Sequence, residues 1–168
     1  MRHSPLLRLV LAVTLLGALP AGARAQDAAT RAQILAVVDS ALVGISSGDM
    51  LAFTDLMTSE ATMMPVRTKD GVASYTVRTR AADRATEMRK GITERGWSGE
   101  VRVSGSLATV WLPYDLYIDG TWSHCGVDSF TLVKTAAGWR IATMAWSAEQ
   151  PPLCPRHPDG PPKGAKAP

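Results

Sequence analysis

The chain has 168 residues, of which 46% are hydrophobic and 20% charged, so its length and composition suit one globular domain with a buried core. This composition argues against disorder, and no apolar run reaches the roughly 18 residues that a membrane span needs. The 18 basic and 15 acidic residues give a net charge of +3, which would suggest nucleic-acid binding only if the basic residues formed a patch.

The first 25 residues have the pattern of a secretory signal peptide. Arg2 and Arg8 precede an apolar run over residues 9–19, and a small-residue cleavage site follows at residues 23–25. We therefore predict cleavage near Ala25 and a secreted or periplasmic protein; the alternative is a buried N-terminal helix. Three arginines leave with the signal, and the remaining 15 basic and 15 acidic residues make the mature chain neutral, with no basic stripe for nucleic acid.

The mature chain divides into one domain and a tail. Residues 151–168 hold seven of the eleven prolines and no apolar periodicity, so we predict an extended Pro-rich tail there. No repeat or change of composition divides residues 26–150, which we take as a single domain.

The first half of this domain has helical patterning. Apolar residues at helical spacing predict a helix over residues 28–46, with one buried face formed by Ile34, Leu35, Val37, Val38, Ala41, Leu42 and Ile45. Gly48-Asp49 is typical of a helix stop followed by a cap, so a shorter helix should carry Met50, Phe53, Leu56 and Met57. A hairpin around Lys69-Asp70-Gly71 and a third helix over residues 80–94 should follow.

The second half is rich in β-branched and aromatic residues. It predicts an antiparallel meander of four strands, over residues 97–104, 106–118, 121–134 and 139–147. Helices followed by a long curved antiparallel sheet indicate the α+β class, in which about three helices cover one sheet face. Such an arrangement commonly encloses a pocket.

The two-residue turn Asp119-Gly120 sets the expected register of the two longest strands. Counting outward from it, Asp115 faces His124. The count places one set of residues on a single face, namely Trp111, Asp115, Tyr117, Trp122, His124, Asp128 and Phe130, and leaves Val110, Leu112, Tyr114, Leu116, Cys125 and Val127 on the other.

The first of these faces has the composition of a ligand site. An imidazole oriented by one carboxylate, with a second carboxylate nearby, can perform general acid/base chemistry; here these would be His124, Asp115 and Asp128. The alternative is that this face is solvent-exposed or a dimer surface, and that His124 and Asp115 are only a cross-strand polar pair. Pro113 could mark a bulge, which would exchange the faces on one side of it.

Several segments resemble the secreted proteins of the nuclear transport factor 2-like superfamily that are named for lumazine binding. They are residues 107–114, Asp119-Gly120, Ser123-His124-Cys125-Gly126-Val127-Asp128-Ser129-Phe130, residues 138–141 and Cys154-Pro155. The resemblance covers most of residues 34–155. It implies a cone-shaped fold of three helices around a curved mixed sheet, with a cavity between them and a tendency to form homodimers.

Polyketide cyclases and ketosteroid isomerases resemble this chain in the same way. In the cyclases an acidic residue in a Gly-x-Asp-x-Phe strand lines the cavity, which favours the pocket interpretation for Asp128 and, by the register, for His124, Asp115 and Trp111. The isomerases use a tyrosine and an acid to bind an enolate oxygen. Tyr114 is the ligand-binding candidate for that tyrosine, although the count places it on the opposite face.

The mature chain retains two cysteines, Cys125 and Cys154, in a compartment where disulfides persist. We expect them to form a bridge that holds the tail to the sheet; the alternative is a reactive Cys125 beside His124, although sequence neighbours on a strand point to opposite faces. We expect no metal site and no cofactor, because the mature chain has only two histidines and no glycine-rich phosphate loop.

Three functions remain open from the sequence. The first is a small-molecule-binding domain in which Trp111 and Phe130 line the cavity while His124, Asp115 and Asp128 anchor the ligand. The second is an isomerase- or cyclase-type enzyme that moves a proton with Asp128 and His124. The third is a dimeric structural or interaction domain.

Overall fold

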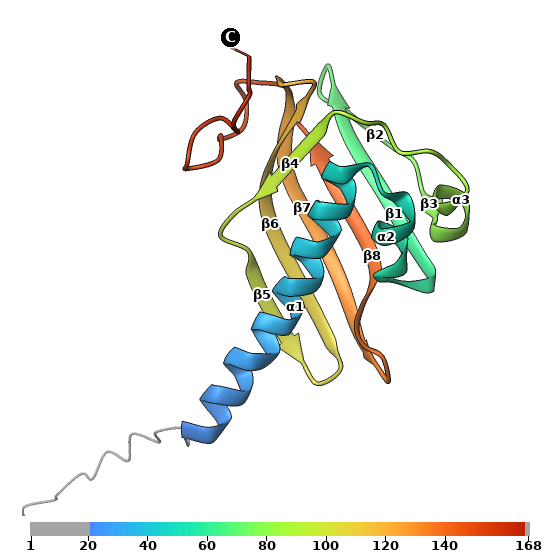
Figure 1. Ribbon diagram of the computed structural model, residues 1–168, viewed down its shortest axis with the longest axis vertical. Coiled ribbons are helices and arrows are strands. Elements are labelled where there is room, and N and C mark those ends of the chain that lie inside the picture. The colour runs from blue at the N-terminus through green and yellow to red at the C-terminus, as the bar shows by residue number, and fades with distance from the viewer. Residues whose placement is uncertain (1–20, 167–168) are drawn as a thin grey trace, which may run out of the picture.

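The computed structural model describes residues 21–166, and Figure 1 shows the helices lying over one face of a strongly curved sheet. The elements, in chain order, are α1 (Ala21–Ser47), α2 (Met50–Asp55), β1 (Met57–Lys69), β2 (Val72–Tyr75), β3 (Arg78–Thr79), α3 (Arg80–Arg84), β4 (Ile92–Gly96), β5 (Glu100–Ser104), β6 (Leu107–Ile118), β7 (Thr121–Thr135) and β8 (Gly138–Ala148). The predicted signal peptide lies mostly outside these residues, and its cleavage stays a prediction.

The sheet is mixed, with strand order β2-β1-β8-β7-β6-β4, while β3 pairs with β1 and β5 pairs with β6. All pairs are antiparallel except β1 with β8, which are parallel. The last strand of the sheet in chain order, β8, therefore lies beside the first, β1, and the helices cover the concave face. The predicted α+β class, with helices on one face of a curved and mostly antiparallel sheet, is confirmed.

Helix α1 supplies the helical side of the core. Ile34, Val38 and Ala41 are fully buried, and the remaining residues of the predicted apolar face are buried or packed against this cluster. Residues 27–47 are also long and apolar enough to cross a membrane by composition alone. Because three side chains of this segment are inaccessible to solvent inside the domain, α1 acts here as a core helix.

The predicted turns are confirmed by their backbone angles. Gly48 has a φ of +70° after α1, and the side chain of Asp49 accepts a hydrogen bond from the backbone N–H of Ala52, which caps α2. Asp119 and Gly120 both have positive φ, as a tight two-residue hairpin turn requires. The turn between β1 and β2 is likewise made by Asp70 and Gly71.

The predicted third helix over residues 80–94 is wrong beyond its first five residues. Helix α3 ends at Arg84, and Ile92 begins strand β4, which pairs with β6. Gly91 has a φ of +77°, and its carbonyl accepts a hydrogen bond from the backbone N–H of Asp119 at 2.8 Å. The helical spacing of apolar residues was therefore overridden by the pairing of this segment with the edge of the sheet.

The register predicted from the Asp119-Gly120 turn is correct for only two pairs. Tyr117 faces Trp122, but the next pair is Leu116 with His124, so Ser123 is an additional residue in β7. A bulge of this kind shifts every later pair by one position and exchanges the faces of one strand relative to the other. The predicted pairing of Asp115 with His124 is wrong, because Asp115 faces Cys125.

Pro113, where the sequence suggested a bulge, has a regular partner in β7. It faces Val127, and it lies where the other neighbour of β6 changes, since β4 pairs as far as Tyr114 and β5 begins at Trp111. A proline has no N–H to donate, and at this position no strand on that side requires one.

The tail crosses the convex side of the β6–β7 hairpin. A disulfide joins Cys125 of β7 to Cys154, with 5.9 Å between their Cα atoms, so the predicted bridge is confirmed. The guanidinium of Arg156 lies 4.2 Å from the ring centroid of Trp122, and the backbone N–H of Lys166 donates to the carbonyl of Gly120 at 2.8 Å. These contacts hold the tail, drawn in red in Figure 1, against the hairpin.

Candidate functional site

A pocket of about 430 Å³ lies between the concave face of the sheet and the helices. Most of its walls are apolar, and charged residues also contribute. The lining residues are Ile45, Met50, Phe53, Met63, Arg67, Arg78, Asp83, Thr86, Glu87, Met88, Arg89, Ile92, Glu94, Tyr114, Leu116, His124, Met144 and Trp146. A largely apolar cleft with a few polar groups is the usual form of a small-molecule site.

Two carboxyl groups meet beside this pocket. Asp128 of β7 is fully buried, and neither of its carboxylate oxygens accepts a hydrogen bond from an N–H or hydroxyl donor within residues 21–166. Its neighbour is the carboxyl of Glu94 on β4, which lines the pocket. Because two adjacent buried carboxylates repel each other, a hydrogen bond between them requires a proton on one of the two groups.

The environment of this pair favours its protonated forms. Burial raises the pKa of Glu94 to about 7, although the hydrogen bond with Asp128 opposes that rise. Burial, followed by the neighbouring Glu94 carboxyl, raises the pKa of Asp128 well above its ordinary value of 3.8. The pair therefore holds a proton near neutral pH, and it can both donate and accept a hydrogen bond.

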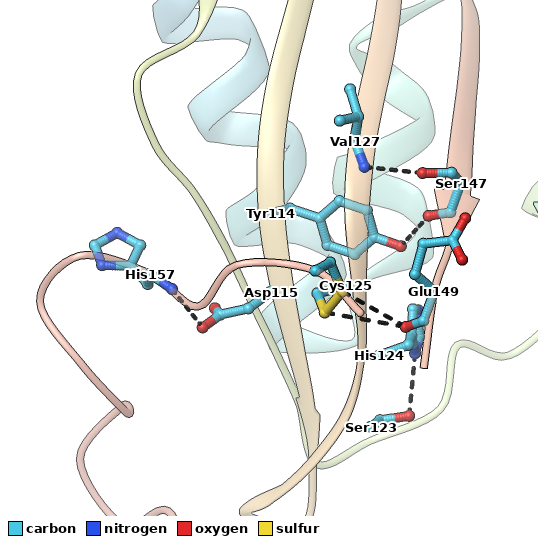
Figure 2. Close-up of a disulfide and its surroundings, with 10 residues drawn as sticks. Tyr114, Asp115, Ser123, His124, Cys125, Val127, Ser147, Glu149 and His157 are labelled. Atoms are coloured by element: carbon cyan, nitrogen blue, oxygen red, sulfur yellow. Dashed lines mark hydrogen bonds between the residues drawn. A yellow bond between two sulfur atoms is a disulfide. The ribbon is translucent and has the colours of Figure 1, made fainter. Parts of the chain in front are cut away.

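Tyr114 lies on the same sheet face as this pair, in contrast to the predicted placement. Its hydroxyl donates to the backbone carbonyl of Ser147 at 2.7 Å, as Figure 2 shows. Gly126, which faces Tyr114 across the hairpin, leaves room for Ser147 to approach this closely. Burial, then the charges of Asp128 and Glu94, raise the pKa of Tyr114, so the phenol stays protonated.

His124 also lines the pocket. Its Nδ1 lies 3.0 Å from the hydroxyl of Ser123, the bulge residue, and its ring meets that of Tyr114 edge to face at 5.9 Å. Burial, and then the charge of Arg67, lower the pKa of His124. The imidazole is therefore neutral at pH 7, and Nε2 has no hydrogen-bond partner within the described part of the chain.

Asp115, predicted to orient His124, lies on the opposite face of the sheet. Arg95 donates to both of its carboxylate oxygens, at 3.0 and 2.6 Å, and the backbone N–H of His157 donates to it at 3.2 Å. Figure 2 shows Asp115 directed toward the tail and Tyr114 directed away from it. Asp115 is thus a structural partner of Arg95 and of the tail.

The two predicted aromatic walls are also separated from the pocket. Trp111 lies on the convex face and is 55% exposed, while Phe130 is fully buried in the core and does not line the pocket. The sequence patterns did not indicate Glu94, because it falls within the segment expected to be helical. Within residues 21–166 no three His, Cys, Asp or Glu side chains are grouped so that they could hold a metal ion.

Comparison with known proteins identifies the fold. No family model and no curated protein matches the sequence. Among solved structures, a nuclear transport factor 2-like protein with a cystatin-like fold from Novosphingobium aromaticivorans is 20% identical, with a TM-score of 0.60 over 76% of this chain and 86% of that chain. A protein of unknown function with a cystatin-like fold from Nostoc punctiforme is 8% identical, with a TM-score of 0.57 over 74% and 93% of the two chains.

A third structure, from Parabacteroides distasonis, has been provisionally named a ketosteroid isomerase. It is 15% identical, with a TM-score of 0.54 over 70% of this chain and 86% of that chain. These likenesses show that the chain has the nuclear transport factor 2-like, or cystatin-like, cone fold. They show the fold alone, since one such fold carries many functions.

Proposed function

We propose that the chain is an exported domain that binds a small, mainly apolar molecule in the pocket between sheet and helices. One observation carries this proposal: Asp128 is fully buried with only another carboxyl beside it, next to a pocket of about 430 Å³. A buried acid without a cation or an N–H donor destabilises the folded state, so its presence beside a cleft indicates a functional role.

The polar groups suit a ligand with a neutral oxygen. The shared proton of Glu94 and Asp128 can be donated to a carbonyl or hydroxyl oxygen, and the unprotonated carboxyl oxygens can accept from a ligand hydroxyl. His124 adds a second neutral donor or acceptor on the pocket wall. The ligand body would lie against the apolar side chains of Phe53, Met144 and Trp146.

A binding measurement tests this proposal. Isothermal titration calorimetry with 2-naphthol, a neutral aromatic alcohol, should give saturable binding to one site. Ile45→Trp should abolish the binding by filling the pocket, and Asp128→Leu should weaken it about tenfold by removing the buried polar group. Glu100→Gln changes an exposed carboxylate on β5 and should leave the affinity unchanged. Absence of saturable binding, or equal binding by Ile45→Trp, would contradict the proposal.

Proton transfer is the second candidate function, and the raised pKa of the carboxyl pair favours it. A buried carboxyl group that titrates near neutral pH beside a pocket can take a proton from carbon next to a carbonyl and return it elsewhere. Exchange of such protons for deuterium, followed by NMR on a cyclic unsaturated ketone, would reveal this activity. Loss of exchange in both Asp128→Asn and Glu94→Gln is expected, and an undiminished rate in either variant would exclude the carboxyl pair.

A further inference from the structure

The arginines that line the pocket differ in what neutralises them. Arg78 forms an ion pair with Asp83 at 3.0 Å and lies over the ring of Trp146, at 5.4 Å from its centroid. Arg89 lies 3.3 Å from the carboxylate of Asp119. Arg67 lines the same pocket, is exposed, and has no carboxylate within 4.0 Å among residues 21–166. Its guanidinium is thus available to a ligand.

Arg67 occupies a defined place relative to the carboxyl pair. Met63, Pro65 and Arg67 alternate onto one face of β1, and the first and last of them line the pocket. Pro65 pairs with Trp146 and Trp146 pairs with Asp128, so Arg67 lies two residues further along the sheet than the carboxyl pair. From strand spacing, the Cα atoms of Arg67 and Asp128 are on the order of 12 Å apart.

We infer that Arg67 binds the carboxylate of an amphipathic acid ligand, whose apolar body fills the pocket and whose far end carries a neutral oxygen at Glu94 and Asp128. This inference rests on the proposed binding function and specifies its ligand class. A planar guanidinium matches one carboxylate through two parallel hydrogen bonds. A phosphate dianion fits less well, because Asp83 and Glu87 line the same pocket and Arg67 is the single unpaired cation there among the described residues.

A set of three related probes tests the ligand class. At pH 7.5, 6-hydroxy-2-naphthoic acid is ionised, its methyl ester keeps the size without the charge, and 2-naphthol lacks the group altogether. Calorimetry should show that the wild-type protein binds the acid about three- to tenfold more tightly than the ester. This preference should weaken as salt is raised from 0.05 to about 0.5 M, because screening reduces an exposed ion pair.

Arg67→Gln should remove the preference for the acid over the ester. Arg102→Gln is the matched control, since it removes the same charge from an exposed position on β5 and should retain the preference. Equal affinity for acid and ester, or an undiminished preference in Arg67→Gln, would overturn the assignment of Arg67. If 2-naphthol itself fails to bind, the proposed binding function fails instead, so the two failures are distinguishable.

Discussion

Two buried aspartates on neighbouring strands have opposite environments. Asp115 and Asp128 are both fully buried, on opposite faces of the sheet. Asp115 receives two hydrogen bonds from Arg95 and one from the backbone of the tail, whereas Asp128 has only the carboxyl of Glu94. A buried acid whose charge is balanced by a cation and hydrogen-bond donors has a structural role. A buried acid whose neighbour is another acid indicates a functional site.

The largest loss of stability is expected from removal of the disulfide on the convex face of the sheet. Cys154→Ser releases a link between residues that are 29 positions apart. By the loop-entropy estimate it should lower the free energy of unfolding by about 3 to 4 kcal/mol. Urea denaturation measures this value, with Cys125→Ser/Cys154→Ser as the control for a free thiol. A loss below about 1 kcal/mol would show that the tail contributes little to the convex face.

The ion pair between Asp115 and Arg95 can be removed by a single substitution. Asp115→Ala leaves the partly buried Arg95 without its carboxylate, and should cost about 2 to 4 kcal/mol in urea denaturation. Asp55→Ala is the control, because Asp55 forms an ion pair with Arg84 at 2.6 Å but is 60% exposed. That exposed pair should contribute less than about 1 kcal/mol. Equal losses in the two variants would contradict the structural role assigned to Asp115.

The carboxyl pair should make stability fall as pH rises. The folded state keeps protons on Glu94 and Asp128 at a pH where the unfolded state, with ordinary values of 4.5 and 3.8, has lost them. The unfolded state then binds fewer protons, so the free energy of unfolding decreases as pH rises from about 5 through 7 and above. His124 has a lowered pKa and opposes this trend below its ordinary value of 6.5.

The difference between wild type and Asp128→Asn isolates the carboxyl pair, because His124 is present in both. Melting temperatures measured from pH 5 to pH 8 should fall more steeply in the wild type. At pH 8 the variant should be more stable by about 1 to 2 kcal/mol, since only one carboxyl of the pair, Glu94, remains to ionise in it. Parallel pH profiles would show that Asp128 titrates normally.

The smallest effect is expected at Trp111. Because this side chain is 55% exposed on the convex face, Trp111→Thr should change the free energy of unfolding by less than about 0.5 kcal/mol. It should also leave 2-naphthol affinity unchanged, in contrast to Asp128→Leu. The expected homodimer stays a prediction; light scattering of wild type and variant would test whether Trp111, with Leu107 exposed on the same face of β6, is covered by a second copy.

Much of the fold follows from local patterns. The buried face of α1, the cap at Asp49, the turn at Asp119-Gly120 and the three long strands are each set by residues close together in the sequence. The prediction of a third helix over residues 80–94 was wrong because helical spacing of apolar residues is also compatible with a turn followed by an edge strand. Glu94 could not be assigned to the site for the same reason.

The sequence predicted which types of residue form the site, but not which particular residues lie in it. His124, Asp128 and Tyr114 lie on one face only because Ser123 is an additional residue in β7, and that bulge has no marker such as glycine or proline. A single inserted residue exchanges the faces of a strand, so an error of one position placed Asp115 and Trp111 in the pocket and removed Tyr114 from it.

The sequence by itself determined that this chain forms an α+β domain and that acid/base residues gather on the β6–β7 hairpin, and it favoured the cysteine bridge that the structure contains. Only the tertiary structure decided which acid is compensated by a cation and which lies beside the pocket with another carboxyl. The reason is physical: pattern and turn chemistry act over a few residues, whereas the environment of a buried charge depends on side chains from β4, β7 and the tail, which are brought together by folding.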